Sequence, residues 1–237
     1  MKNYTLTLLL TAAPLFAGTP APVAPAPQQN TEQGWTLGLE VLALQPYQSE
    51  GYYDDNDFDA GYRGSLGYQF NDGLFVKATY FGYATETDNN EDLKAQYVDL
   101  IVGQNFKPMD KLTMSPFAGL RWGNFKEDLG DIEFDGYGVV LGLDVTRALG
   151  NNFSLYANAK QSLLVGTTDY SYSESYDSDT TGFVTEVGLG LQYDFCLGSV
   201  AGNVRAGLEG QYWAGLSDDD SENTSLAGFA LGVNFRF

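Results

Sequence analysis

The last nine residues, Phe229 to Phe237, alternate strictly between large apolar side chains and small or polar ones. Successive side chains of a β-strand point to opposite faces, so Phe229, Leu231, Val233, Phe235 and Phe237 share one face. The opposite face ends in a single charge, that of Arg236. One face of this kind suits lipid and the other suits a lumen, which is typical of the closing strand of a membrane β-barrel.

The N-terminal part of the chain has the features of an export signal. Lys2 precedes a short apolar stretch from Leu6 to Phe16, and small residues follow at Ala17 and Gly18. We expect a signal peptide over residues 1–17, a Pro- and Ala-rich periplasmic linker over 18–33 and a β-barrel over 34–237. No later segment has the roughly 18 consecutive apolar residues that a membrane-spanning helix needs.

Period-two alternation recurs along the rest of the chain and predicts an all-β fold, a transmembrane antiparallel up-and-down barrel of about ten strands. The expected strands cover residues 34–45, 58–70, 74–85, 92–106, 112–125, 134–148, 152–165, 182–195, 202–213 and 225–237. The connections alternate between short and long, so we expect short turns on the periplasmic side and long loops outside. Pro116 is the weakest point, because proline cannot donate to a strand ladder.

The two phases of each strand differ in a way that favours a membrane barrel over a soluble one. One phase is large and apolar and has aromatic residues near both ends, as at Trp35, Tyr137 and Tyr193. The other is mostly Gly, Ser, Thr and Gln with one or two charges per strand. A water-facing surface would carry far more charge, so we expect the apolar phase to face lipid and the sparse phase to face the lumen.

The charges on the sparse phase form a nearly neutral set of five acids and six bases. This predicted lumen network consists of Glu40, Arg63, Lys77, Asp99, Arg121, Asp144, Lys160, Glu186, Arg205, Glu209 and Arg236. Two interpretations use the same residues. Ion pairs could fill and brace a narrow barrel, or the inward glycines could leave a water-filled path whose selectivity these charges set.

Acidic residues gather at the predicted outer rim. The chain carries 31 acidic and 12 basic residues, and 22 of the acids fall in or beside the five long connections. Such a field attracts cations and repels anions, and it argues against nucleic-acid binding. Asp55, Asp57 and Asp59 resemble the opening of a calcium loop but lack its glycine and closing glutamate. The weaker prediction is divalent-cation binding shared with a second acidic loop, formed by Asp218, Asp219 and Asp220.

No histidine is present, which removes the usual general base of barrel hydrolases such as omptin proteases and outer-membrane phospholipases. We therefore expect no enzyme and no cofactor. The single Cys196 is expected in a short turn, as a lone thiol or as an intermolecular or lipid attachment point. Residues 167–176 alternate Tyr and Ser, which fits either an extended hairpin or an adhesive surface.

Several short motifs carry a resemblance to a known family. The residues Gly34-Trp35 with Glu40, Gly61-Tyr62-Arg63, Val98-Asp99-Leu100, Gly119-Leu120-Arg121 and Gly136-Tyr137-Gly138 resemble the Legionella-type major outer-membrane-protein-like family of pore-forming barrels. The resemblance covers residues 34–237 and implies an outer-membrane pore or surface barrel. Phe235 and Phe237 also resemble the terminal signal that the barrel-assembly machinery reads.

The expected role is a small pore, preferring cations, or a general surface barrel of a Gram-negative outer membrane. The alternative is a non-conducting adhesion or structural protein that acts through its acidic, Tyr/Ser-rich loops. The expected partners are outer-membrane lipid and lipopolysaccharide, the assembly machinery and small cationic solutes.

Overall fold

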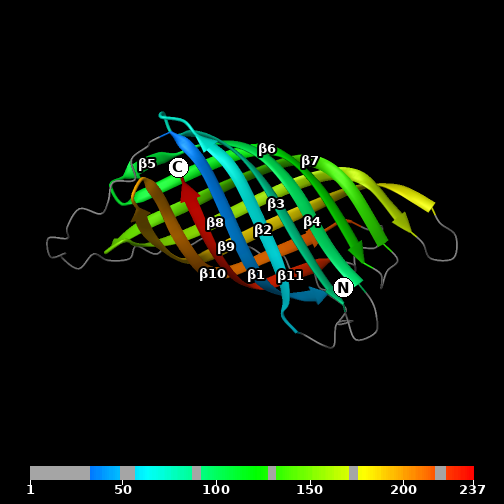
Figure 1. Cartoon of the computed structure of the whole chain (residues 1–237). Coiled ribbons are helices and arrows are strands. Elements are labelled where there is room, and N and C mark those ends of the chain that lie inside the picture. The colour runs from blue at the N-terminus through cyan, green and yellow to red at the C-terminus, as the bar shows by residue number, and fades with distance from the viewer. Residues whose placement is uncertain (1–32, 49–56, 87–91, 128–131, 171–175, 217–222) are drawn as a thin grey trace, which may run out of the picture.

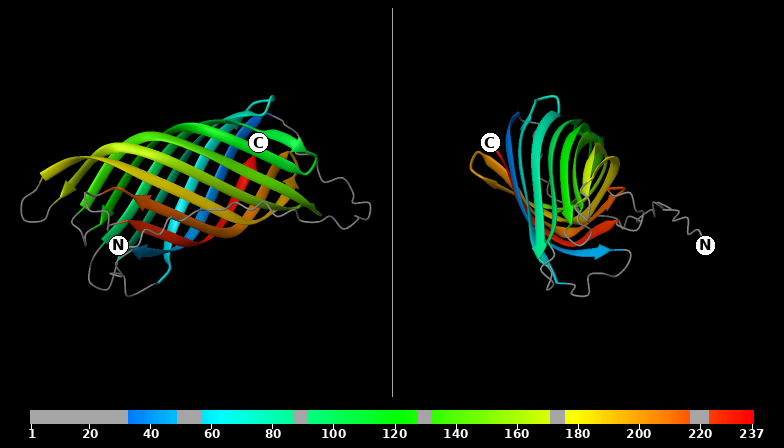
Figure 2. Two further views of the ribbon diagram at one scale, coloured as in Figure 1. Left: turned by 180° about the vertical axis from the view of Figure 1, so that it is seen from behind. Right: turned by 90° about the vertical axis from the view of Figure 1, so that its right-hand side faces the viewer.

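A computed structural model of the chain describes residues 33–48, 57–86, 92–127, 132–170, 176–216 and 223–237. These residues form one antiparallel sheet that closes on itself as a barrel (Figure 1; Figure 2). The predicted all-β barrel is therefore confirmed. The predicted signal peptide and nearly all of the predicted linker lie outside the described residues. Within the described part of the chain, no helix has the length and apolar character needed to cross a membrane.

The strands follow one another around the barrel in chain order. Their bounds are β1 Gly34–Gln48, β2 Asp59–Gln69, β3 Leu74–Glu86, β4 Asp92–Gln104, β5 Phe106–Met109, β6 Leu112–Glu127, β7 Ile132–Gly150, β8 Phe153–Tyr170, β9 Tyr176–Leu197, β10 Val200–Ala214 and β11 Thr224–Arg236. The four-residue β5 continues β4 beyond a break at Asn105, and both pair with β6. Ten strands thus make up the barrel, as expected, with one of them interrupted.

Two pairings close the barrel. β1 pairs with β11 from Thr36 opposite Arg236 to Gln48 opposite Thr224. β4 pairs with β6, so that the sheet is also continuous past the short strand β5. Closure satisfies the backbone groups of every strand, which is the condition for a sheet to stand in lipid.

β6 begins at Leu112, as expected, and Pro116 lies inside the strand. The ladder between β6 and β4 ends at Phe117 opposite Gly103, and the ladder with β5 resumes at Met114 opposite Phe106. Pro116 falls in the interval between the two ladders, where the missing N–H removes no rung on that side. The break at Asn105, between β4 and β5, therefore lies beside Pro116 of the neighbouring strand β6.

The predicted faces are confirmed by exposure. Large apolar side chains of the outward phase, such as Val41, Leu141 and Leu231, are more than half exposed. Aromatic residues flank this band on its outer face, among them Trp35 and Phe153 near the short turns and Tyr137 and Tyr212 nearer the long connections. The turn after β7 uses left-handed backbone at Asn151 and Asn152, which gives the tight connection a twist that suits a hairpin.

Strand ends nearest the long connections reach further than predicted. β9 begins at Tyr176 rather than at residue 182, and β8 continues to Tyr170, which pairs with Tyr176. The extended hairpin expected for residues 167–176 is confirmed for the residues on either side of 171–175. Cys196 lies within β9, two residues before the Gly198–Ser199 turn, so its expected position in the turn was wrong; its side chain is exposed.

Candidate functional site inside the barrel

Seven of the eleven predicted lumen charges meet in one buried cluster, here called the charge layer. Its members are Glu40, Arg63, Asp99, Arg121, Lys160, Glu186 and Glu209. They come from seven strands on all sides of the barrel, and four carboxylates meet three bases. The expected ion-paired network is therefore present in this part of the lumen.

Strand register places three of these ion pairs. Glu40 lies directly opposite Arg63 across β1 and β2, and Asp99 lies opposite Arg121 across β4 and β6. Lys160 lies opposite Glu186 across β8 and β9. Side chains at directly opposed positions are about 5 Å apart at Cβ, so each pair is neutralised by its own hairpin.

Arg121 and Glu186 join these local pairs across the lumen. Arg121 donates from Nε and Nη2 to the two oxygens of Asp99 at 2.6 and 2.7 Å, and from Nη2 to Glu186 Oε1 at 2.6 Å. Glu186 also accepts from Lys160 Nζ at 2.7 Å. Arg121 and Glu186 are each only 1% exposed. Such charges are stable in a dry interior only when they are paired this completely.

Arg63 makes the other half of the charge layer. It donates from Nη1 to Glu40 at 2.6 Å and to Glu209 Oε2 at 2.9 Å, while its Nη2 bonds the second oxygen of Glu209. Its Nη2 is also 3.7 Å from Glu186. The two halves thus share Glu186, and the layer spans the barrel.

Tyr97 lies at the centre of the charge layer, although it is not among the residues predicted to form the lumen network. Its hydroxyl donates to Glu186 at 2.7 Å and accepts from Lys160 at 3.0 Å. The Arg121 guanidinium lies 3.7 Å from the centre of its ring. This contact explains how Arg121 Nη1 tolerates burial without a hydrogen-bond acceptor. Tyr97 is two residues from Asp99, so strand parity places it inward.

Above the charge layer, toward the long connections, the lumen is filled by apolar side chains, here called the apolar layer. It comprises Leu42, Leu44, Phe81, Tyr83, Leu93, Ala95, Phe125, Phe134, Leu164, Val184, Trp213, Leu216, Leu226 and Ala230. Most are 0–2% exposed. The stacked rings of Phe81 and Tyr97, 4.9 Å apart, join the two layers. The expectation that the inward phase is sparse throughout was therefore wrong at this end of the barrel.

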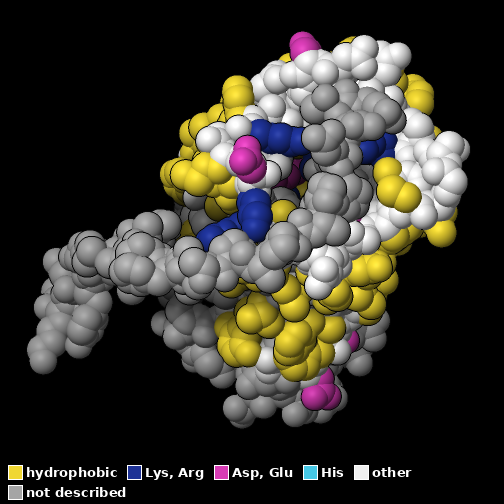
Figure 3. Space-filling model, turned by 90° about the vertical axis from the view of Figure 1, so that its left-hand side faces the viewer, with side chains coloured by type: hydrophobic (Ala, Val, Ile, Leu, Met, Phe, Trp, Pro, Cys, Tyr) yellow, Lys and Arg dark blue, Asp and Glu magenta, His cyan; other side chains and the backbone are white. Residues whose placement is uncertain are grey.

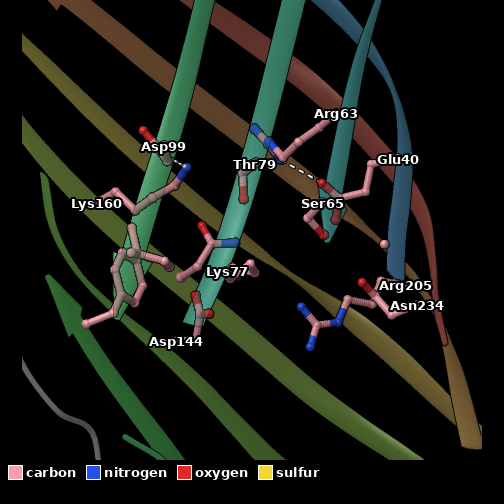
Figure 4. Close-up of a pocket in the computed structure, with 14 residues that line it drawn as sticks. Glu40, Arg63, Ser65, Lys77, Thr79, Asp99, Asp144, Lys160, Arg205 and Asn234 are labelled. Carbon is pink, nitrogen blue, oxygen red and sulfur yellow. Dashed lines mark hydrogen bonds and ion pairs between the residues drawn. The ribbon is translucent and has the colours of Figure 1, made fainter. Parts of the chain in front are cut away.

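Below the charge layer, toward the short turns, the lumen contains a cavity of about 90 Å³. Lys77, Asp144 and Arg205 line it, and none of the three has an ion pair within 4 Å among the described residues (Figure 4). Arg236 lies on the inward phase at the rim and makes no ion pair with the residues that the structure describes. Viewed from the short-turn end, Lys and Arg side chains lie around the mouth of the barrel together with acidic side chains (Figure 3).

The predicted divalent-cation loops are only partly covered by the structure. Asp55 and the acidic segment Asp218 to Asp220 lie outside the described residues, and no metal-binding group occurs in the part of the chain that the structure describes. Asp59 accepts a hydrogen bond from Thr85 Oγ1 across β2 and β3, which gives this carboxylate a structural partner. Asp57 precedes β2 and is exposed.

The two terminal phenylalanines lie at the barrel seam. The rings of Phe235 and Phe237 stack with centres 6.4 Å apart, and Phe195 meets Phe235 edge-on. The backbone N–H of Phe237 donates to the carbonyl of Trp35 at 3.0 Å. Both phenylalanines belong to the outward phase, as predicted, and their role as an assembly signal stays a prediction.

A protein-family model described as the Legionella pneumophila major outer membrane protein precursor matches residues 26–237. The chain belongs to this family. The resemblance drawn from the sequence motifs is thereby confirmed, and the family places the protein among Gram-negative outer-membrane proteins. None of the curated proteins matches.

Solved structures with the same architecture are outer-membrane barrels of low sequence identity. The outer membrane protease OmpT from Escherichia coli has 8% identity and a TM-score of 0.54, over 86% of this chain and 97% of that one. Neisserial surface protein A has 15% identity and a TM-score of 0.46, over 87% and 99%. The N-terminal barrel domain of Pseudomonas aeruginosa OprF has 18% identity and a TM-score of 0.31, over 84% and 97%. The similarity to OmpT concerns the fold alone.

Proposed function

We propose that this protein is a closed, non-conducting surface barrel that anchors its acidic outer segments in the membrane. The observation that carries the proposal is the pair of layers across the lumen. The charge layer occupies the middle of the barrel, and the apolar layer fills the end toward the long connections.

The apolar layer is the stronger barrier to ions. An ion must keep its hydration shell or find polar substitutes, and transfer of an unpaired charge into apolar packing is very costly. Trp213, Phe134 and Leu44 offer no such substitute and are 0% exposed. The charge layer adds a second barrier because its carboxylates and bases are already bound to one another.

The outer end of the barrel supports a role in surface presentation. The hairpin of β8 and β9 keeps its pairing up to Tyr170 opposite Tyr176, well beyond the outward apolar residues Val165 and Phe183. In the sequence, most of the acidic residues of the chain fall in or beside the long connections. A rigid stem that carries acidic segments fits contact with cations or basic partners outside the cell.

Planar-bilayer recording of the refolded full chain tests the proposal. We expect insertion without steady conductance steps, with insertion verified separately by the heat-dependent migration of the folded barrel. A double variant, Trp213→Gly with Arg121→Ser, removes a large side chain from each layer and should conduct. The matched control, Tyr137→Gly with Arg147→Ser, makes the same kind of change on the outward face and should remain silent. Steady steps from the parent protein would overturn the proposal.

A small cation-preferring pore is the second candidate. The cavity that reaches the charge layer from the short-turn end favours it, because only the two layers then separate the two ends of the lumen. This candidate requires steps from the parent chain, with a reversal potential in a salt gradient that shows preference for K⁺ over Cl⁻.

A further inference from the structure

Two of the bases that line the cavity, Lys77 and Arg205, make no ion pair among the described residues, whereas the other two, Arg63 and Lys160, belong to the charge layer. Lys77 Nζ has no carboxylate within 4 Å and no hydrogen-bond acceptor among the described residues. Arg205 donates only from Nε, to Gln192 Oε1 at 2.8 Å. The two terminal nitrogens of its guanidinium have no acceptor in the described part of the chain. Elsewhere in this lumen, each base of the charge layer has at least one carboxylate within 3 Å.

Arg205 is held in place as a binding group would be. The hydrogen bond to Gln192 fixes one edge of the guanidinium, and the Tyr156 ring lies 5.1 Å from its central carbon. Gln192 is itself fixed by its bond to Asp194 Oδ1 at 2.6 Å. The terminal N–H groups of the Arg205 guanidinium are left for a ligand. Such a planar pair of donors matches the geometry of two oxygens of an oxyanion.

Neutral polar groups complete the cavity. Ser65, Asn158 and Asn234 line it together with Lys77 and Arg205, and its volume of about 90 Å³ suits a small solute or a few waters. Asp144 is the one unpaired carboxylate in its wall. In Figure 4, Asp144 and Arg205 lie to either side of Lys77. The wall also contains Glu40, Arg63, Asp99 and Lys160, but these four are ion-paired within the charge layer. Among the described residues, the lining charges that make no ion pair are therefore two bases, Lys77 and Arg205, and one acid, Asp144.

The electrostatics of the whole chain give the route of entry. The long connections carry most of the acidic residues and repel anions, and the two layers block the lumen on that side. The cavity lies toward the short-turn end, where Figure 3 shows Lys and Arg side chains together with acidic ones.

We propose that the cavity is a binding site for a small oxyanion, of the size of inorganic phosphate, that enters from the short-turn end. Lys77 and the terminal nitrogens of Arg205 bind the anion, and Ser65, Asn158 and Asn234 supply neutral hydrogen bonds. The site stands independently of conduction, because a closed barrel and a gated one would both present it.

Phosphate titration of the folded full chain in a neutral detergent tests the site, with calorimetry and thermal unfolding as readouts. We expect saturable binding and a melting temperature that rises with phosphate, while chloride at equal ionic strength has no such effect. A Lys77→Gln and Arg205→Gln double variant should bind at least tenfold more weakly. Lys111→Gln, which removes one positive charge at an exposed turn, should bind like the parent.

Asp144→Asn provides a test of opposite sign. The substitution removes the repelling carboxylate and should tighten phosphate binding several-fold, which a merely structural role of the cavity would not produce. Absence of saturable binding by the parent, or a double variant that folds and binds equally well, would overturn the proposal. Weaker binding by a folded Asp144→Asn variant would also overturn it.

Discussion

At the scale of single residues, Arg121 has the most demanding environment in the lumen. Its side chain is fully enclosed, two carboxylates bind it from different strands, and the ring of Tyr97 covers its face. Removal of a base from such a cluster leaves buried carboxylates without a counter-charge, which costs more than the original pair contributed.

We therefore expect Arg121→Ala to lower the free energy of unfolding by about 3–5 kcal/mol. Asp99 and Glu186 lose their main partner in this variant, so urea-induced unfolding in lipid vesicles, followed by tryptophan fluorescence, should show an earlier midpoint. Arg147→Ala, on the exposed outward phase of β7, is the control and should change stability by less than about 0.5 kcal/mol. Equal midpoints for Arg121→Ala and the parent would contradict the structural role of the charge layer.

Sequence parity was sufficient to place the charges but insufficient to pair them. Period-two alternation puts Arg63, Arg121 and Glu186 inward without any knowledge of the fold. The contact of Arg63 with Glu209 joins β2 to β10, and it depends on the diameter of the barrel and on the reach of each side chain. Tyr97 shares the parity of Asp99, so its inward position was predictable; its central role depended on the same long-range geometry.

At the scale of elements, β6 combines a proline with a change of partner strand. Pro116 lies where the ladder with β4 has ended and the ladder with β5 has not yet resumed. A proline should therefore have very different effects on stability at two positions of this strand.

We expect Pro116→Val to change stability by no more than about 0.5–1 kcal/mol, because a restored N–H has no waiting partner on the side of β4 and β5. Leu120→Pro, four residues further on and paired on both sides, should cost about 3 kcal/mol or prevent folding. Heat-modified gel migration and urea unfolding of both variants measure this contrast. A large loss of stability in Pro116→Val with little effect of Leu120→Pro would contradict the assignment of the ladder gap.

The presence of each strand could be predicted from the sequence, but the positions of the strand ends could be predicted less well. The apolar outward phase marks where a strand crosses lipid, but backbone pairing continues into polar residues such as Thr167 and Asp179, where that signal stops. The apolar layer was missed for a related reason. Some runs are apolar on both phases, such as Val41 to Leu44 and Leu163 to Val165, and such runs indicate that both faces of the strand are covered. These runs mark the strands whose inward side chains form the apolar layer.

At the scale of the whole molecule, the two ends of the barrel differ in chemistry. Apolar packing fills one end, and a cavity lined by charged and polar side chains occupies the other. Cys196 is exposed at the end that carries the short turns, which outer-membrane barrels direct toward the periplasm.

A membrane-impermeant maleimide applied to intact cells should accordingly leave Cys196 unmodified, and should modify it once the outer membrane is permeabilised. The counterpart is Asp179→Cys in a Cys196→Ser background, which places the thiol at the exposed opposite end and should react in intact cells. Mass spectrometry of the purified protein measures both. The reverse pattern of labelling would show that the short turns face outward.

The seam between β1 and β11 has a consequence for biogenesis. Along one edge of β1, thirteen residues pair with β11, and the N–H of Phe237 donates to the carbonyl of Trp35. Hairpins between neighbouring strands can form in chain order, but the barrel can close only when β11 is available to pair with β1. Until then one edge of each seam strand has no partner, which is the kind of exposed edge that can pair with another chain.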